Sequence, residues 1–279
     1  MLTVLPLCLM GLLVGCLGAL TGIGGGIILV PLLTLLWHVP LHAAMGVSLI
    51  AVVAQSTGAA ATPGRDTLRN DRVAIFLETG AAVGAVIGAI LTAHAPLPLL
   101  SILFGLLLLF ASYSAFRKTG RPETDAATPD ITNCDGWAGR LQLHGECLDR
   151  GERTRYRAQS VWSGWSTMTV AGFLSGLLGV GAGAVKVIAM DQIMKLPYKV
   201  STATSNMIVG LTAAAGIGIY LKNGFINATL ATPVVLGMVG GAMLGTRIIT
   251  HAPVKPLRVL FNAVVLSFGL LMIARGVGL

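Results

Sequence analysis

The stretch that decides the fold reads GCLGALTGIGGGIILVP, from Gly15 to Pro31. A related stretch, GFLSGLLGVGAGAVKVI, begins at Gly172, which is 157 residues later. The same offset continues without a gap through further matched pairs. They are Pro40/Pro197, Ser48/Ser205, Gly80/Gly237, Gly84/Gly241, Gly88/Gly245 and Phe104/Phe261. A constant offset over this length indicates an internal duplication.

The composition is that of a membrane protein. Of the 279 residues, 54% are hydrophobic and only 11% are charged, whereas roughly 25% are charged in ordinary soluble domains. Apolar runs of about 20 residues recur, and each is long enough to cross the hydrocarbon core of a bilayer. A soluble protein of this composition would have to bury nearly every helix on all sides. The sequence therefore predicts an all-α polytopic membrane protein.

Ten apolar segments are expected, five in each repeat. They cover residues 2–21, 23–38, 42–62, 73–93 and 97–116 in the first repeat, and 160–178, 180–195, 199–221, 228–250 and 255–276 in the second. The second segment of each repeat is short, about 15 residues, which is roughly 23 Å of helix. It either crosses with tilt or forms a broken or re-entrant pair with the segment before it, so about 8–10 membrane segments result. Non-helical backbone at that depth needs protein or water beside it, which predicts a cavity at the glycine clusters.

The charged connections predict the orientation and the domains. Basic residues gather in alternate connections, which the positive-inside rule places in the cytoplasm, with both termini outside. An odd number of segments per repeat then inverts the second repeat relative to the first, as in many secondary transporters. The expected division is a first membrane repeat at 1–116, a cytoplasmic connector at 117–158 and a second membrane repeat at 159–279. In the connector, alternating apolar and polar residues around a turn at 141–156 predict a β-hairpin.

The two glycine clusters are the first candidate for a binding site. Each precedes a helix whose first N–H groups lack internal partners, and such a helix start attracts anions. The alternative is that the glycines only permit close helix packing, which is the interpretation we favour for Gly80, Gly84, Gly88 and their counterparts. For the clusters we favour substrate binding. The residues concerned are Gly24, Gly25, Gly26, Gly181, Ala182 and Gly183.

Lys186 is the sharpest single candidate, because it lies three residues after Gly183 in an apolar stretch where the first repeat has Leu29. Ionisable groups inside a membrane are costly and usually functional. Lys186 is expected to balance the charge of a bound anion, or to lose its proton when the site empties; the alternative is a side chain that snorkels to the interface. Asp191 is a weaker candidate, either as a partner of Lys186 or as a proton-binding group.

Neutral hydrogen-bond donors form a further group of candidates. Ser48 and Ser205 occupy equivalent positions in the third segment of each repeat, with Asn206 beside the second. Such side chains bind an oxyanion without a charge of their own, or alternatively join helices by hydrogen bonds. Gln55, Thr202 and Thr204 are weaker candidates for coupling or gating.

Other chemistries find little support in the sequence. The formal charge of +8 resides mostly in short connections, and no basic and aromatic interleaving suggests a nucleic-acid partner. We find no nucleophile–base constellation, metal-ligand spacing or nucleotide-binding loop, so neither an enzyme, a metal site nor a cofactor is expected. Cys134 and Cys147 are interpreted as free thiols, and a redox or sensory role for this pair remains the alternative from another class.

The two clusters and the residues after them resemble a known family. GIGGGIILVP at 22–31 with Val39-Pro40 and Ser48, and GVGAGAVKV at 179–187 with LPYKVSTATSN at 196–206, resemble the sulfite exporter TauE/SafE family. The resemblance extends over both repeats. Ala182 stands where the second cluster usually has Gly, and Ile188 stands where Val-Pro would be completed. The resemblance implies a permease of the bacterial or archaeal cytoplasmic membrane for small sulfur-containing anions such as sulfite, thiosulfate or organosulfonates.

The residues and the resemblance together predict a secondary transporter of a small oxyanion. The anion would be held between the two glycine clusters near the membrane midplane and moved by alternating access, with protons as a candidate coupling ion. An uncoupled anion channel is the alternative that the sequence does not separate from a carrier. The expected partners are the anion and the lipid bilayer, with a homodimer left open.

Overall fold

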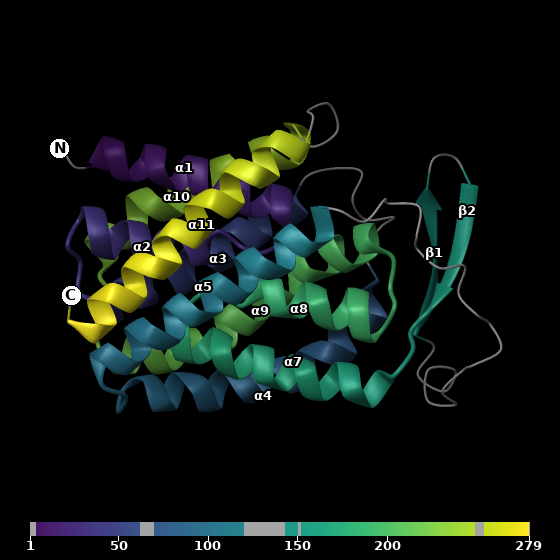
Figure 1. The fold of residues 1–279 in the computed structure, drawn as a ribbon, viewed down its shortest axis with the longest axis horizontal. Helices are drawn as coiled ribbons and strands as arrows, with labels where there is room; N and C mark the ends of the chain where they lie inside the picture. The colour runs from purple at the N-terminus through teal and green to yellow at the C-terminus, as the bar shows by residue number, and fades with distance from the viewer. Residues whose placement is uncertain (1–3, 62–69, 120–142, 150–151, 249–253, 279) are drawn as a thin grey trace.

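The computed structural model describes residues 4–61, 70–119, 143–149, 152–248 and 254–278, and these are mostly helical (Figure 1). The first repeat contains α1 (Val4–Thr21), α2 (Gly26–Leu36), α3 (Leu41–Ala60), α4 (Asp71–Thr92) and α5 (Leu97–Thr119). The second contains α7 (Val161–Leu178), α8 (Gly183–Ile188) with the π-helical turn η2 (Ala189–Ile193), α9 (Tyr198–Lys222), α10 (Ala228–Ile248) and α11 (Val254–Val277). Each of the ten expected segments is thus confirmed as helical.

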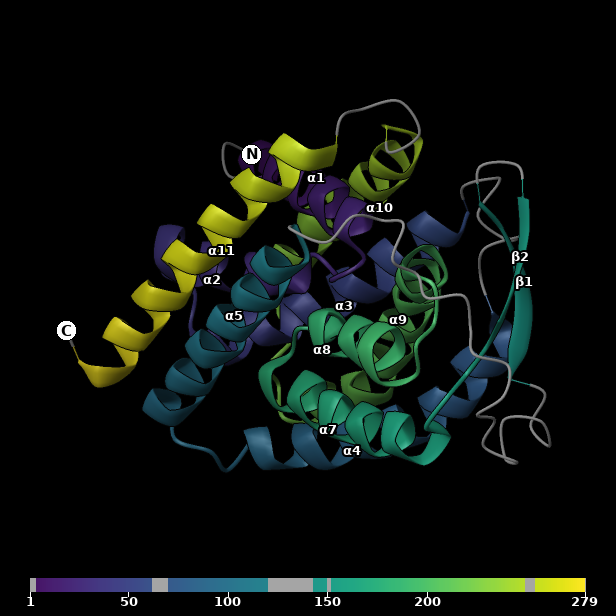
Figure 2. The same ribbon diagram turned by 45° about the vertical axis from the view of Figure 1, so that its right-hand side comes forward.

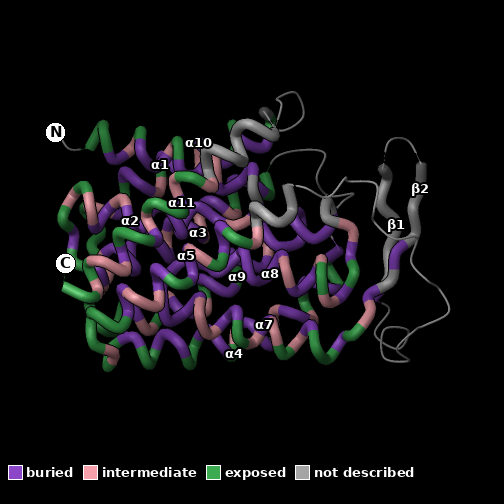
Figure 3. The backbone as a smooth tube through the Cα atoms, viewed as in Figure 1, coloured by how far each residue is buried: buried purple, intermediate pink, exposed green. Residues whose placement is uncertain are grey.

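The outer surfaces of these helices are apolar. Within the described residues, five helices are long and apolar enough to cross a membrane, namely Leu41–Ala60, Asp71–Thr92, Leu97–Ser114, Val200–Lys222 and Ala228–Arg247. Large hydrophobic side chains such as Ile75, Ile87 and Leu236 are exposed along their outer faces (Figure 3). A protein surrounded by water rarely exposes so much apolar surface, so these faces suit contact with lipid.

Helices of the two repeats interleave. α1 packs against α10, α4 packs against α7, and α5 packs against α11, while α3 and α9 lie together in the interior (Figures 1 and 2). By the offset of the duplication, α1 corresponds to α7 and α10 corresponds to α4. Each repeat therefore uses the same helix faces to bind the other, and neither could bury these faces alone.

Small residues make these helix pairs close. Gly84 and Gly88 of α4 lie against the backbone of Thr169 and Phe173 on α7, where an added Cβ would collide with carbonyl oxygens. The equivalent glycines of α10, Gly241 and Gly245, lie in the same way against Leu12 and Cys16 on α1. The packing interpretation of these glycines is confirmed, because small residues let transmembrane helices approach at the backbone.

The duplication is also present in the local backbone. His38 and Lys195 occupy equivalent positions, and both have a left-handed φ, of 52° and 56°. The hydrogen bond from Val39 N–H to Leu33 O recurs between Leu196 and Met190, at 3.1 and 3.0 Å. Together with the reciprocal helix pairs, these contacts form the pattern that a local two-fold axis produces.

The orientation of the two repeats relative to a membrane remains a prediction. The start of α1 and the end of α11 lie at one end of the molecule, and the connector's β-hairpin lies at the other (Figures 1 and 2). α7 begins beside the hairpin, so it runs opposite to its counterpart α1. This arrangement agrees with inverted repeats, but which end faces the cytoplasm is not tested, and neither is the division at 116 and 158.

The connector forms a hairpin where the alternation indicates one. Strands β1 (His144–Asp149) and β2 (Glu152–Arg157) pair antiparallel, from His144↔Arg157 to Asp149↔Glu152. Tyr156 is buried, and its hydroxyl accepts a hydrogen bond from Asn70 Nδ2 at 3.0 Å, just before α4. The hairpin is thereby attached to the helical bundle rather than separate from it.

We predict that Gly84→Ala and Gly241→Ala each destabilise the protein by about 1–3 kcal/mol, because the new Cβ forces two backbones apart. Gly240→Ala is the matched control, since no atom lies within 4 Å of a Cβ placed there. Thermal unfolding of the purified protein in detergent measures the difference. Equal stability of all three variants would contradict close packing as the role of these glycines.

Candidate functional site

The two glycine clusters meet inside the protein. We call residues 22–25 the first Gly loop and residues 179–182 the second Gly loop. A Cβ added to Gly26 would lie 3.0 Å from the carbonyl oxygen of Val180, and Gly183 lies directly against the carbonyl of Ile23. Ile23 and Val180 are themselves equivalent in the duplication, so the contact is reciprocal. Both loops are buried apart from a partly exposed Ile23.

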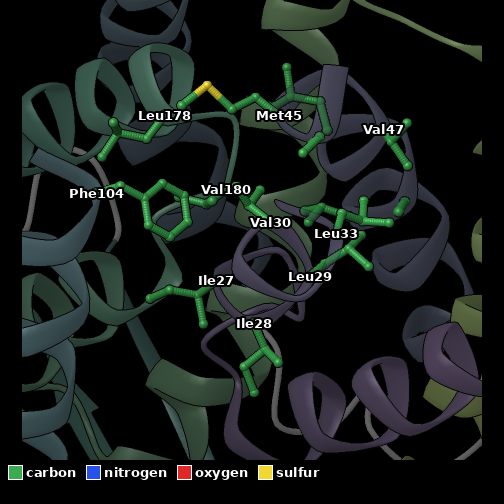
Figure 4. Packing of buried hydrophobic residues seen from close by; sticks show 14 of the residues in the cluster. Ile27, Ile28, Leu29, Val30, Leu33, Met45, Val47, Phe104, Leu178 and Val180 are labelled. Atoms are coloured by element: carbon green, nitrogen blue, oxygen red, sulfur yellow. The ribbon is translucent and has the colours of Figure 1, made fainter. Parts of the chain in front are cut away.

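Apolar side chains surround the meeting point of the loops. Figure 4 shows this cluster, in which Ile27–Val30 of α2 pack with Val180, Phe104, Met45 and Leu178. Val52 of α3 and Val209 of α9, another equivalent pair, touch Gly181 on either side. In this conformation the loops pack on each other and on these side chains, and the cavity expected beside them remains a prediction.

The second Gly loop has a backbone conformation that its sequence disfavours. Gly24 and Gly181 both have a left-handed φ, of 87° and 75°. Ala182 also has a left-handed φ of 45°, whereas its counterpart Gly25 is right-handed at −67°. An L-residue with a side chain pays roughly 1–2 kcal/mol for this conformation. The two loops therefore differ in shape at this position, and the second is the more strained.

Side chains from α3 and α9 hold the first Gly loop. The N–H of Gly25 donates to Gln55 Oε1 at 2.7 Å, and Gln55 is almost completely buried. Ser205 Oγ donates to the carbonyl of Gly22 at 3.2 Å. One anchor comes from the same repeat and the other from the opposite repeat, so movement between the repeats must change at least one of them.

Two buried polar side-chain atoms on α3 and α9, the helices that hold the first Gly loop, have no hydrogen-bond partner. Ser48 is fully buried, and its Oγ, which lies beside Gly26, is unpaired. The side-chain nitrogen of Asn206 is likewise buried and unpaired, although the Asn206 carbonyl accepts a 2.6 Å hydrogen bond from Ser56 Oγ. Most buried polar groups in proteins are paired, so such exceptions call for an explanation. Hydrogen bonds to a bound ligand would be such an explanation.

In the structure Lys186 is connected to Glu78, a partner that the sequence alone did not assign to it. Its side chain is fully buried, which excludes the snorkelling alternative, and its Nζ donates to Thr212 Oγ1 and to the carbonyl of Ile208 at 3.4 Å. Thr212 Oγ1 also lies 2.8 and 3.1 Å from the two carboxylate oxygens of Glu78. The same hydroxyl lies 2.7 Å from the carbonyl of Ile208, which is a second acceptor for its one hydrogen. Thr212 thus lies between the ammonium and the carboxylate.

The Lys186–Thr212–Glu78 triad joins three helices, α8, α9 and α4. The duplication does not repeat it, because the equivalent positions hold Leu29, Gln55 and Val235. Neither Glu78 nor Thr212 is among the site residues that the sequence predicts. A comparison of the two repeats could have found both residues. Glu78 is charged where the second repeat has the apolar Val235, and Thr212 has a hydroxyl where the first repeat has Gln55.

The weaker candidates lie in different places. The methyl group of Thr202 packs against Gly22, and Thr204 Oγ1 accepts a hydrogen bond from the N–H of Asn70 at 3.3 Å. Thr204 is therefore linked to the start of α4, near the docked hairpin. Asp191 lies in η2 and is partly buried. The structure does not test a coupling or gating role for any of these residues.

Metal and thiol chemistry gain no geometric support in the described part of the chain. No group of three or more His, Cys, Asp or Glu side chains there could hold a metal ion. Cys8 and Cys16 are free thiols on α1. Cys134 lies outside the described residues, and for Cys147 the structure describes only the strand that contains it. The redox alternative therefore stays untested.

Known proteins resemble this chain along almost its whole length. The family model described as Sulfite exporter TauE/SafE matches residues 7–272. Probable membrane transporter protein YunE of Bacillus subtilis (strain 168) is 27% identical over 279 residues, with 97% of each chain covered. Probable membrane transporter protein YdhB of the same organism is 29% identical over 255 residues, with 91% of each covered. No solved structure matches the chain significantly.

We predict that Thr212→Val lowers the free energy of unfolding by about 1–3 kcal/mol, because it removes the hydroxyl that Lys186 and Glu78 share. Thr212→Ser keeps the hydroxyl and should cost less than about 1 kcal/mol for the lost methyl group. Thermal or chemical unfolding in detergent compares them. If valine is tolerated as well as serine, the hydroxyl does not hold the triad together.

Proposed function

The chain belongs to the sulfite exporter TauE/SafE family and is a multi-pass membrane transporter, and on that premise we propose that it carries a small sulfur-containing oxyanion. Sulfite, thiosulfate and organosulfonates are the substrate class. The proposed location is the bacterial or archaeal cytoplasmic membrane, with the connector 117–158 on the cytoplasmic side. The proposal makes the protein a permease rather than an enzyme.

The observation that carries this proposal is a buried donor without a partner, Ser48 Oγ, beside the meeting Gly loops, together with a second such donor on α9 next to Ser205. Ser48 Oγ and Asn206 Nδ2 are neutral donors without partners. Ser48 also lies beside Gly26, the first residue of α2, where backbone N–H groups lack intrahelical acceptors and the helix dipole favours negative charge. An oxyanion has several acceptor oxygens, so it can satisfy side-chain and backbone donors together.

Ser205 and the remaining loop residues complete the proposed site. The reciprocal contact joins Gly26 to Val180 and Gly183 to Ile23, and Ser205 reaches the first loop from α9. Gly24, Gly25, Gly181 and Ala182 are the other loop residues of the proposed site. Because the loops touch in this conformation, an anion can enter only when they separate. Lys186 follows the second loop on α8, so the positive charge would move together with that loop.

The two-fold pattern of contacts supports alternating access as the mechanism. Repeats that bind each other through equivalent surfaces can exchange conformations, so that each in turn opens the path to its own side of the membrane. Rocking of one repeat against the other would expose the loops first to one side and then to the other. Proton coupling fits this mechanism, and a homodimer is compatible with it.

We predict that purified protein binds thiosulfate or sulfite saturably, and that Ser48→Ala and Asn206→Leu each weaken binding about tenfold or more. A hydrogen bond to a charged group contributes about 1.5–3 kcal/mol, and leucine is the residue that the first repeat has at the position of Asn206. Isothermal titration calorimetry measures the affinities, with sulfate and taurine as comparison ligands.

Ser267→Ala is the matched control for this experiment. Ser267 lies exposed on α11, where its hydroxyl donates to the carbonyl of Ala263, so its loss should leave the affinity unchanged. Unchanged affinity in both site variants would place the anion elsewhere. Absence of binding to any sulfur anion would remove the proposed substrate class and leave the membrane fold standing.

A further inference from the structure

A fully buried positive charge sits next to the proposed anion site. Among the described residues, Lys186 is the charged side chain with no exposed surface. A buried ion left without a partner is costly, so Lys186 stays charged only where an opposite charge accompanies it. In this conformation Glu78 provides it through Thr212.

The charge pair and the anion site share one face of α9. Ser205, Ile208 and Thr212 follow one another at spacings of three and four residues, which places them on the same side of a helix. Ser205 contacts the first Gly loop, Ile208 gives its carbonyl to Lys186, and Thr212 bridges to Glu78. Seven residues of helix correspond to roughly 10 Å. The Ile208 carbonyl that binds Lys186 lies about one helical turn from Ser205, so the charge of an anion at the Gly loops would act on Lys186 together with that of Glu78.

The other charged groups around Glu78 lie on the ends of the elements that pack against it. α7 contains no Asp, Glu, Lys, Arg or His, and the charge that acts on Glu78 is that of Lys186. Tyr220 lies at the far end of α9, bound to the carbonyl of Gly176 at 2.9 Å. The remaining ionisable residues on α4, η2 and α9 are Asp71, Arg72, Asp191, Tyr198, Lys199 and Lys222.

We propose that Glu78 is the proton-binding site that couples transport to a proton gradient. This inference rests on the proposed function. In the empty protein, the Glu78 carboxylate neutralises Lys186. A bound oxyanion competes with the carboxylate for Lys186, and one proton taken up from the solvent by Glu78 removes this competing charge, so that Lys186 can pair with the anion. The proton and the anion then move together, and both leave before Glu78 can pair with Lys186 again.

The partial exposure of Glu78 agrees with this role, because a coupling group must exchange protons while its partner stays enclosed. Glu78 is partly exposed, whereas Lys186 and Thr212 are fully buried. The duplication supplies no second charge pair, since Leu29 is the counterpart of Lys186 and Val235 is the counterpart of Glu78. One coupling site per chain follows, and hence one proton per transported anion.

The test counts protons taken up when thiosulfate binds, because the charge of thiosulfate is constant near neutral pH. Calorimetry in two buffers of different ionisation enthalpy gives this number for the purified full-length protein. We expect about one proton per anion for the wild type and none for Glu78→Gln, which keeps a hydrogen-bond acceptor for Thr212. Asp71→Asn is the matched control and should retain the uptake of one proton.

Proteoliposomes extend the test to transport. A pH gradient should accelerate thiosulfate uptake several-fold in the wild type, whereas Glu78→Gln should exchange labelled thiosulfate across the membrane but ignore the gradient. Thiosulfate-linked proton uptake that persists in Glu78→Gln would overturn the proposal. Transport by the wild type with no proton uptake would overturn it too and leave the proposed function intact. If the wild type neither binds nor moves a sulfur anion, the proposed function fails and Glu78 loses its role with it.

A second pair of variants covers the case in which Glu78→Gln does not fold. Glu78→Val alone leaves Lys186 buried without a counter-charge and should reduce the yield of folded protein strongly. Adding Lys186→Leu converts the positions to residues that the other repeat tolerates, and it should restore folding. Failure of the double variant to recover would show that the two charges do not depend on each other, which contradicts the pairing on which the proposal rests.

Discussion

The backbone contact between the two Gly loops is the constraint on which the rest of the structure depends. Gly183 lies against the carbonyl of Ile23, and Gly26 lies beside the carbonyl of Val180. Side chains at these two glycines would hold the loops apart. Because the loops meet, α2 and α8 start in the interior, and the interleaved pairs α1·α10 and α4·α7 enclose them. Because the chain is duplicated, the same pattern of small residues occurs in both repeats and forms both sides of the contact.

The third helices of the two repeats differ in polarity. α3 has Met45, Val47 and Leu49 at the positions where α9 has Thr202, Thr204 and Asn206. At these three positions α9 is polar and α3 is apolar, although α3 also has the buried polar residues Ser48 and Gln55. A substrate between α3 and α9 would therefore contact more polar side chains on α9 than on α3. The asymmetry also explains how a nearly symmetric scaffold can carry a single charged triad.

Much of the fold could be predicted from the sequence, because its determinants are local or repeated. Apolar length located the helices, and the offset of 157 residues related Gly26 to Gly183 before any contact was known. The partner of Lys186 could not be predicted in this way. Glu78 and Thr212 lie on other helices, and only the packing of α4 against α9 brings them to Lys186. Likewise, the left-handed conformation of Ala182 follows from the loop contact and opposes the preference of the residue.

A carrier whose loops meet and separate must be occupied by one anion at a time, which distinguishes it from an open channel. Counterflow of labelled thiosulfate into proteoliposomes loaded with unlabelled thiosulfate tests this claim most directly. For a carrier we expect saturable entry that unlabelled anion on the opposite side accelerates, with transient accumulation of label above its external concentration. If the label never accumulates above its electrochemical equilibrium, and if unlabelled anion inside does not accelerate its entry, the protein is a channel and not a carrier.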